Sequence, residues 1–296
     1  MRPRLLLFAL LLVVAFVQSA QAQFQVSLDI KRRFLMVYEP IVATVTVANL
    51  SGRDVTLTDS PTQSWFGFQV NYGDVSRIVP PNDPFYRQPP LTIAMGQTIK
   101  RSVVLNNLFP MGELGLYRVR ATIFDSAREK YYQSPVIGLE LSEGKVVWQQ
   151  NAGVPSGYNG AGGTRKVSLL TFRKSESTYL YVRVEDPDNA VVFCTLALGR
   201  IISGIDPEMQ FDGQNVLNVL QLIGQKTYLF TRISLDGEVI SQETYTTAKY
   251  RPTLRRDASG SISVYGGTAT RTGAPGDPGE KVPNKLSDRP VPVPAE

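Results

Sequence analysis

The chain has 296 residues, 43% of them hydrophobic, which is enough for two domains that each bury a core. It contains one cysteine and no histidine, and its formal net charge is +5. The lack of histidine excludes Ser-His and Cys-His catalysis and histidine-ligated zinc sites. A net charge this small does not indicate a nucleic-acid partner, so carboxylate-pair chemistry, Ser-Lys chemistry or no catalysis remain.

The first 22 residues have the pattern of a secretory signal peptide. Arg2 and Arg4 precede the unbroken apolar run Leu5 to Val17, and Ala20-Gln21-Ala22 fits a cleavage site. The apolar run is shorter than the ~20 residues that a membrane-spanning helix needs. We therefore expect an exported protein, periplasmic or extracellular, with no transmembrane segment after cleavage.

Residues 23–142 are predicted to form strand after strand, with no helix. Apolar residues alternate with polar ones, which indicates antiparallel sheets with one solvated face. Proline- and glycine-containing turns separate these runs at the spacing of a β-sandwich. The alternating sets are Phe24, Val26, Leu28 and Ile30; Ile41, Ala43, Val45 and Val47; and Phe66, Phe68, Val70 and Tyr72.

Two motifs in this region carry a family resemblance. Tyr38 to Ser51 has the sequence YEPIVATVTVANLS, and Gly115 to Ala121 has the sequence GLYRVRA. Both resemble segments of bacterial immunoglobulin-like domains, including the proteinase-inhibitor-like and macroglobulin-like groups. The resemblance implies an immunoglobulin-like sandwich for residues 23–142, and by name it also implies proteinase inhibition. The proline-rich segment Arg77 to Arg87 is the loop through which an inhibitor would act.

Residues 143–267 contain an internal repeat. Thr178 to Val184 matches Thr227 to Ile233, and at the same offset Val167 to Arg173 falls on Val216 to Leu222. The period resembles that of β-propeller blades, but two copies and a fragment at Ser261 to Tyr265 cannot close a ring, which takes at least ~4 blades. We predict a duplicated antiparallel β-meander domain, closed alone or with a partner. Residues 268–296 are rich in proline, glycine and charge, which predicts a disordered tail.

Several motifs that could carry chemistry have simpler structural explanations. The glycine-rich segment Gly153 to Gly163 lacks the lysine of a phosphate-binding loop and is expected to be a linker or hairpin loop. Ser142 and Lys145 satisfy S-x-x-K, but the glycine between them favours a turn. Asp125 is expected to end a strand, and Cys194 to lie as a buried thiol within one.

Acidic residues concentrate at the predicted turns of the repeat. Asp186 and Asp188 form the densest group, within the sequence Asp-Pro-Asp-Asn. Aspartate and asparagine are favoured in tight turns for conformational reasons. We therefore favour turn chemistry here, with calcium binding at Asp186 and Asp188 as the alternative.

The sequence favours an exported, non-catalytic, all-β protein that binds an envelope or extracellular protein or a glycan. Trp65, Phe85 and Tyr86 are the candidate binding surface, because they lie off the predicted core face or in a proline-rich segment. We expect no catalytic residue, no cofactor, no metal site and no nucleic-acid partner. The alternatives are a proteinase inhibitor acting through a loop of the first domain and a carboxylate-dependent hydrolase.

Overall fold

The computed structural model describes residues 23–84, 86–158, 160–202, 204–247, 249–273 and 291–292. Apart from α2 (Leu105–Leu108), a single helical turn, every regular element among these residues is a β-strand, which confirms the all-β prediction. The predicted signal peptide lies outside the described residues. Within the described part of the chain, no helix is long and apolar enough to cross a membrane.

The first half of the chain, residues 23–142, forms three sheets. They have the orders β1-β3-β8, β2-β11-β9-β5-β6 with β10 paired to β9, and β4-β7. Neighbouring strands run antiparallel except β2 and β11, which are parallel. The strands are β1 (Phe24–Asp29), β2 (Phe34–Met36), β3 (Val42–Asn49), β4 (Val55–Leu57), β5 (Phe66–Tyr72), β6 (Arg77–Ile78), β7 (Leu91–Ile93), β8 (Thr98–Val104), β9 (Gly115–Asp125), β10 (Lys130–Gln133) and β11 (Ile137–Ser142).

The period-two alternation of β3 and β9 forms the core between the two larger sheets. Ala43, Val45 and Val47 are buried on one face of β3, whereas the threonines between them are only partly buried. Strand β9 alternates in the same way and faces β3 with its buried side chains, because the two sheets share two apolar clusters. The buried residues of β9 are Tyr117, Val119, Ala121, Ile123, Phe124 and Asp125.

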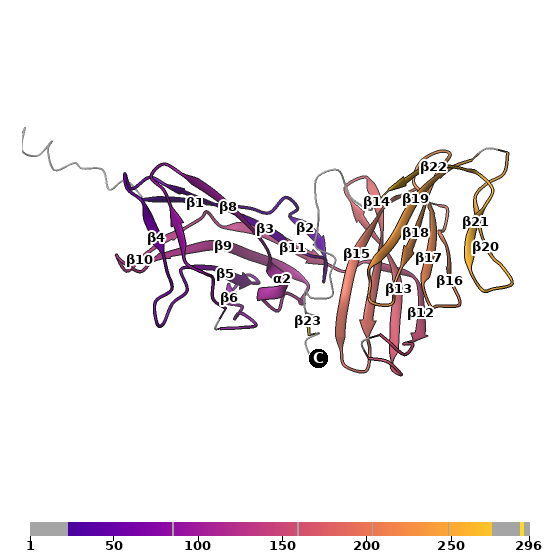
Figure 1. Cartoon of the computed structure of the whole chain (residues 1–296), viewed down its shortest axis with the longest axis horizontal. Coiled ribbons are helices and arrows are strands. Elements are labelled where there is room, and N and C mark those ends of the chain that lie inside the picture. Colours follow the sequence, from indigo (N-terminus) through magenta and orange to yellow (C-terminus); the bar gives the residue numbers. More distant parts are fainter. Residues whose placement is uncertain are drawn as a thin grey trace, which may run out of the picture.

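The second half forms two five-stranded sheets and a hairpin (Figure 1). The sheets have the orders β12-β13-β14-β15-β23 and β16-β17-β18-β19-β22, and the hairpin is β20-β21. In each sheet four strands follow the chain order, and a later strand is added at the far edge. The strands are β12 (Lys145–Gly153), β13 (Thr164–Lys174), β14 (Ser177–Asp186), β15 (Val191–Ile201), β16 (Glu208–Phe211), β17 (Leu217–Leu222), β18 (Thr227–Ile233), β19 (Val239–Thr246), β20 (Thr253–Arg256), β21 (Ile262–Tyr265), β22 (Thr268–Gly273) and β23 (Val291–Pro292).

The two five-stranded sheets pack face to face across one apolar cluster. Leu169 and Val182 from the first sheet meet Val219 and Ile233 from the second, all of them fully buried. The other face of the second sheet is covered by the β20-β21 hairpin, which adds Leu254 and Ile262 to a separate cluster. The second sheet is therefore buried on both faces, which explains why all six residues of β17 are buried.

The predicted disordered tail, residues 268–296, includes residues that form strands in the structure. Thr268–Gly273 form β22 and pair with β19, and Val291–Pro292 form β23 and pair with β15. The prediction relied on the scarcity of apolar side chains, but a strand added to a sheet edge is held by backbone hydrogen bonds, which do not require them. The remaining residues of the predicted tail lie outside the described ranges.

Candidate functional site

Trp65 does not contribute to an exposed binding surface, contrary to the sequence prediction. Its side chain is 1% exposed and lies in the core with Phe66, their ring centroids 5.5 Å apart. The Trp65 backbone N–H donates to Asp59 Oδ1 (2.8 Å), and its indole Nε1–H donates to the Pro89 carbonyl (3.1 Å). Alternation fails here because Trp65 precedes the first residue of β5, so its side chain is not held to the outer face of the sheet.

The segment that contains Tyr86, the second part of the predicted binding surface, is held against Trp65. Tyr86 is partly buried, and burial raises the pKa of its hydroxyl. Gln88 hydrogen-bonds the Tyr86 hydroxyl and accepts from Arg101 (2.6 Å), whose guanidinium lies 5.5 Å from the Trp65 ring. The segment thus covers the buried tryptophan rather than forming an aromatic platform with it. Phe85 lies outside the described residues.

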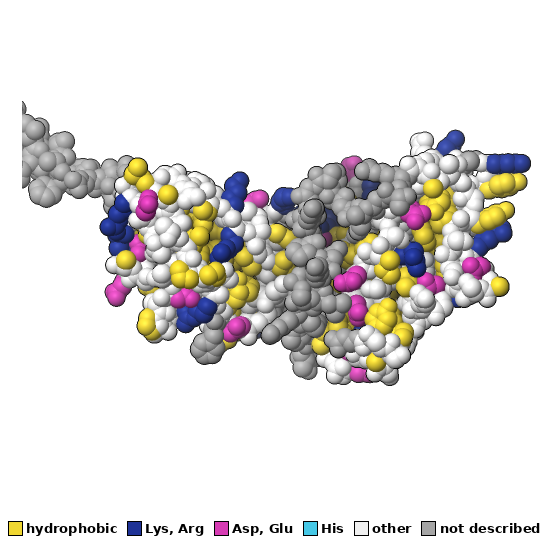
Figure 2. All heavy atoms as spheres, viewed as in Figure 1, with side chains coloured by type: hydrophobic (Ala, Val, Ile, Leu, Met, Phe, Trp, Pro, Cys, Tyr) yellow, Lys and Arg dark blue, Asp and Glu magenta, His cyan; other side chains and the backbone are white. Residues whose placement is uncertain are grey.

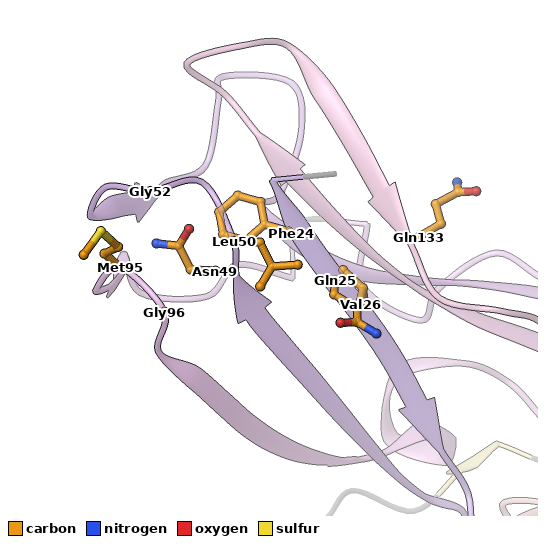
Figure 3. A pocket seen from close by; sticks show the side chains of 9 residues that line it. All are labelled: Phe24, Gln25, Val26, Asn49, Leu50, Gly52, Met95, Gly96 and Gln133. Atoms are coloured by element: carbon orange, nitrogen blue, oxygen red, sulfur yellow. The ribbon is translucent and has the colours of Figure 1, made fainter. Parts of the chain in front are cut away.

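A shallow depression of about 730 Å³ opens at the far end of the first half (Figure 3). Leu50 and Met95 are exposed at its edge, at 51% and 63%. Its buried polar residue, Asn49, is already used: the Asn49 amide donates to the Arg53 and Ile93 carbonyls, and its Oδ1 accepts from Ser51. No charged side chain lines the depression, so it offers apolar contact and no chemistry.

Every buried carboxylate among the described residues lies against a cation. Burying a carboxylate costs free energy unless it is paired, so each of these four contacts has a structural role. The pairs are Asp125 with Arg128 (3.1 Å), Asp186 with Arg165 (3.1 Å), Asp212 with Arg232 (3.5 Å), and Glu39 with Arg32 and Lys174.

Asp186 performs the turn role that the sequence favours. Its Oδ1 accepts from the backbone N–H groups of Asp188 (3.1 Å) and Asn189 (3.2 Å), and its Oδ2 accepts from Asn189 Nδ2 (3.0 Å). The Asn189 side chain is the main cause that lowers the pKa of this carboxyl, with Arg165 adding to the effect. In the part of the chain that the structure describes, no three His, Cys, Asp or Glu side chains gather around a metal-sized space.

The other motifs with chemical potential are structural. Cys194 pairs with Val184 in the β14-β15 ladder, and burial raises the pKa of its thiol to about 12, so the thiolate is scarce at neutral pH. Gly153 and Thr164 are paired residues at the end of the β12-β13 ladder, which makes the glycine-rich segment a hairpin loop. Ser142 ends β11 and Lys145 begins β12, with no helical turn to bring them together.

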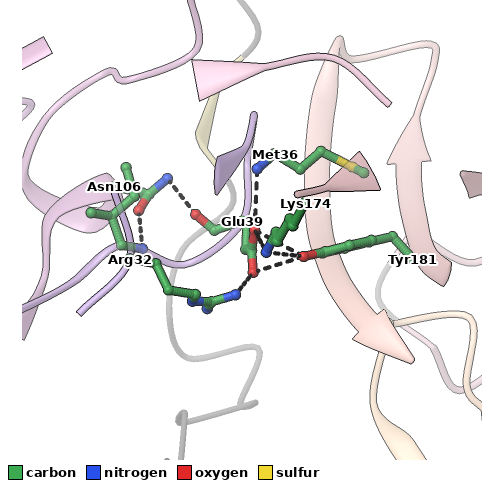
Figure 4. Close-up of polar contacts among 7 residues, drawn as sticks. Arg32, Met36, Glu39, Asn106, Lys174 and Tyr181 are labelled. Atoms are coloured by element: carbon green, nitrogen blue, oxygen red, sulfur yellow. Dashed lines mark hydrogen bonds and ion pairs between the residues drawn. The ribbon is translucent and has the colours of Figure 1, made fainter. Parts of the chain in front are cut away.

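The two halves of the chain meet at a buried polar junction (Figure 4). Glu39, 2% exposed, accepts from the Met36 backbone N–H (3.1 Å) and from the Tyr181 hydroxyl (3.3 Å), and it also lies against Arg32. Lys174 Nζ is 3.7 Å from Glu39 Oε2 and 2.6 Å from the Tyr181 hydroxyl. Burial lowers the pKa of Lys174 and raises that of Tyr181. The junction ties the halves together and leaves no group free for a ligand.

The β20-β21 hairpin carries an exposed surface of a different character. Leu254 is paired with Val264 and points into the cluster against the second sheet. Arg255 and Tyr265 occupy the alternate, outward positions of the two strands, since successive side chains point to opposite faces. Together with the preceding Lys249-Tyr250-Arg251, they form what we call the hairpin surface: Lys249, Tyr250, Arg251, Arg255 and Tyr265.

The hairpin surface combines cations with exposed aromatic rings. The Arg255 guanidinium lies 3.6 Å from the centroid of the Tyr265 ring, and Lys249 Nζ lies 5.4 Å from that of Tyr250. Tyr265 is 52% exposed and Tyr250 is 60% exposed. Figure 2 shows Lys and Arg side chains beside hydrophobic ones at the end of the molecule where Figure 1 labels β20 and β21.

A close backbone contact joins the segment before β20 to the end of β21. Gly266, which follows Tyr265, has φ +79°, and a Cβ there would lie 3.4 Å from the Tyr250 Cβ and 2.8 Å from the Arg251 carbonyl oxygen. Only glycine permits this approach. The Tyr250-Arg251 segment therefore lies tightly against the backbone at the end of β21.

The chain matches no family model, no curated protein and no solved structure. The sequence pattern does not mark the hairpin surface as a candidate binding site, because it indicates only a fragment of the internal repeat in this segment. The signal that could have found it is local. Lys249-Tyr250-Arg251 and Arg255-Arg256 place four basic residues within eight positions, next to a tyrosine.

Proposed function

We propose that the protein is an exported, non-catalytic binding protein whose hairpin surface takes an acidic glycan. The contact between the Arg255 guanidinium and the exposed Tyr265 ring, 3.6 Å apart, is the observation that carries this proposal. Export is inferred from the pattern of residues 1–22, and the lack of catalysis from the absent histidine and the protonated Cys194 thiol.

The chemistry of the hairpin surface matches that of an acidic sugar polymer. Exposed tyrosine rings present flat apolar faces against which the C–H faces of sugar rings stack. Guanidinium groups such as that of Arg255 bind carboxylates in a bidentate manner. Lys249 adds an exposed positive charge beside Tyr250, which favours an anionic ligand over a neutral one, whereas Arg251 is paired with Glu208 (3.5 Å).

The proposal is tested by measuring the binding of polygalacturonate, a carboxylated polysaccharide, against neutral dextran. We expect polygalacturonate binding that weakens with added salt and no binding of dextran. Arg255→Ala and Tyr265→Ala should each weaken binding at least tenfold, and Arg255→Lys should restore only part of it, since lysine keeps the charge but loses the planar donors.

Matched controls are available in the first half of the chain. Arg53→Ala removes an exposed arginine, and Tyr131→Ala removes a tyrosine that is 47% exposed. Neither should alter polygalacturonate binding. Equal losses for the hairpin and control variants, or tighter binding of an oligonucleotide or of anionic vesicles than of the polysaccharide, would contradict the proposal. Export is tested separately by sequencing the N-terminus of secreted protein, where Gln23 is expected to be the first residue.

We also propose a specific architecture for the two halves. The packing of the β1-β3-β8 sheet on the β2-β11-β9-β5-β6 sheet supports an immunoglobulin-like sandwich for residues 23–142. The sequence match at a constant offset, together with the same strand order in both five-stranded sheets, supports a duplicated meander in the second half. Expression of residues 23–142 as a cooperatively folding unit would test the first assignment.

Proteinase inhibition is the second candidate. Ile78, 68% exposed, lies in a segment that is anchored at Val79, whose N–H donates to the Val70 carbonyl (2.9 Å), and at Asn82, whose N–H donates to the Leu108 carbonyl (2.7 Å). An exposed segment held at several points is what a rigid inhibitory loop requires. A panel of serine, cysteine and metalloproteinases assayed at micromolar protein tests this candidate, and activity of every enzyme unchanged would end it.

A further inference from the structure

The edge of the first five-stranded sheet is occupied by a segment that is distant in sequence. Val291–Pro292 form β23 and pair antiparallel with β15, with Val191 opposite Pro292 and Val192 opposite Val291. Figure 1 shows β23 beside β15, near the middle of the molecule and away from the β20-β21 hairpin. Without β23, strand β15 would be paired only with β14, and its outer edge would be open.

The sequence around β23 produces a strand that can donate hydrogen bonds from one side only. Prolines occupy positions 290, 292 and 294, and valines occupy 291 and 293. In a strand, the backbone N–H groups of successive residues point to opposite sides, so the Val291 N–H and the Pro292 nitrogen of β23 face opposite sides. The side toward which the Pro292 nitrogen points receives no hydrogen bond from β23, because proline has no N–H to donate.

The observed register agrees with this asymmetry. Pro292 cannot donate to Val191, so the pair that can exchange both backbone hydrogen bonds is Val192 with Val291. The edge that receives β23 is strand-forming and apolar: Val191 and Val192 are β-branched, and Val192 is 3% exposed. An open edge of this kind pairs readily with other chains.

We propose that the outer edge of β15 is a strand-accepting site whose occupant is this chain's own C-terminal segment, bound through β23 with its N–H donor facing β15. The segment stabilises the edge through the Val291 N–H and presents a donor-free face outward. A second copy of the chain then finds few partners for pairing, so the segment keeps the protein monomeric. This role is independent of the hairpin surface and of the proposed glycan binding.

The test uses the chain truncated after Asp288 and a fluorescent peptide with the sequence of residues 289–296. The peptide should bind the truncated protein, and full-length protein should show much weaker binding because its own segment occupies the edge. Replacing valine by proline at peptide position 291 removes the donor and should weaken binding about tenfold, the effect of roughly one lost hydrogen bond. Replacing Pro292 by valine in the peptide retains the Val291 donor and should preserve binding.

Light scattering gives a second, independent measurement. The full-length protein should be monomeric, the truncated protein should self-associate as concentration rises, and full-length Pro292→Val should self-associate because its outer side regains a donor. Circular dichroism establishes that each variant is folded. If the truncated protein is not folded, full-length Val291→Pro takes its place, because its own segment has lost the donor and it should bind the labelled peptide. Equal binding of the unchanged and Val291→Pro peptides, no binding of the unchanged peptide, or a full-length dimer that dissociates on truncation would overturn the proposal.

Discussion

The Tyr181 hydroxyl lies 3.3 Å from both carboxylate oxygens of Glu39, although the two residues are 142 positions apart. Glu39 belongs to the first half of the chain and Tyr181 to β14 in the second, so this contact joins the halves directly. Apolar packing reinforces it, because Met36 shares a buried cluster with Leu170 and Phe172. The two halves are therefore expected to unfold as one unit.

Glu39→Gln tests this coupling. The substitution removes the negative charge between Arg32 and Lys174 and weakens the hydrogen bonds that Glu39 accepts, which should lower the free energy of unfolding by about 2–3 kcal/mol. Trp65 and Trp148 report on the first and second halves, so single-tryptophan variants follow each half during urea unfolding. The two transitions should coincide in the wild type and separate in Glu39→Gln.

Tyr181→Phe is the matched control for the junction. It removes only the hydroxyl and should cost about 1 kcal/mol, the usual contribution of one buried hydrogen bond. If Glu39→Gln and Tyr181→Phe destabilise equally and the two tryptophan transitions still coincide, the charge at Glu39 does not couple the halves.

Asp186 should make the stability of the second half pH-dependent in the acid range. Its pKa in the folded protein is held below the ordinary value of 3.8, chiefly by the Asn189 side chain. A group with a depressed folded pKa contributes stability above its unfolded pKa, and this contribution is lost as the pH falls through the folded pKa. Asp186→Asn should therefore be less stable than wild type at pH 7, by about 1.5–3 kcal/mol, because the ion pair between Asp186 and Arg165 (3.1 Å) is lost.

The measurement is the free energy of unfolding of wild type and Asp186→Asn between pH 7 and pH 2. The difference between the two proteins should narrow as the pH falls below 4. Asn189→Ala keeps the Asp186–Arg165 pair and should cost only about 1 kcal/mol at pH 7. A difference that stays constant over the whole range would show that Asp186 does not act through its charge.

The strand pattern could be predicted from the sequence because the relevant interactions are periodic. The apolar set of β3 is buried where period-two alternation places it, and Tyr117 begins a second alternating run that faces it. The contact of Glu39 with Tyr181 could not be predicted, because nothing local marks two residues that meet only through the packing of two sheets. Trp65 was assigned to the wrong face for a related reason: it lies before its strand, where alternation no longer applies.

The hairpin surface could be predicted from the sequence only in part. Its composition was visible in Lys249-Tyr250-Arg251, but its geometry depends on the close approach of Gly266 to the Arg251 backbone. The exposure of Tyr265 depends on which face of the hairpin packs against the second sheet. Neither fact follows from a propensity scale, since both are decided by tertiary contacts.

Gly237 should be intolerant of any side chain. It has φ +82°, and a Cβ there would overlap Cys194 Sγ and lie 3.0 Å from the Cys194 Cβ. Gly237→Ala therefore combines backbone strain with a clash in the core, and we expect a loss of about 3 kcal/mol or more. Gly73→Ala separates the two effects, because Gly73 has a similar φ of +73° with nothing within 4 Å of its Cβ position, and it should cost only about 1–2 kcal/mol.

The double variant Cys194→Ala with Gly237→Ala tests the clash itself. Removing Sγ relieves the overlap but not the backbone strain, so the double variant should be more stable than the sum of the single effects predicts. Thermal unfolding of the four proteins in this cycle gives the coupling free energy. Strict additivity would show that Cys194 and Gly237 do not interact as the structure places them.

The Cys194 thiol should be unreactive in the folded protein. Burial raises its pKa to about 12, against an ordinary value of 9.0, so at pH 8 the thiolate that attacks disulfides is about a thousandfold scarcer than for an exposed cysteine. Ellman's reagent at pH 8 should therefore react slowly with native protein and rapidly after unfolding in urea. Glu39→Gln, which has no contact with the β18-β19 turn, provides the discriminating comparison. If the reagent reaches Cys194 through local opening at the β18-β19 turn, Gly237→Ala should raise the native reaction rate and Glu39→Gln should leave that rate unchanged. If the reaction requires unfolding of both halves, both substitutions should raise the native rate. Rapid modification of the native wild-type protein would contradict the burial of this thiol.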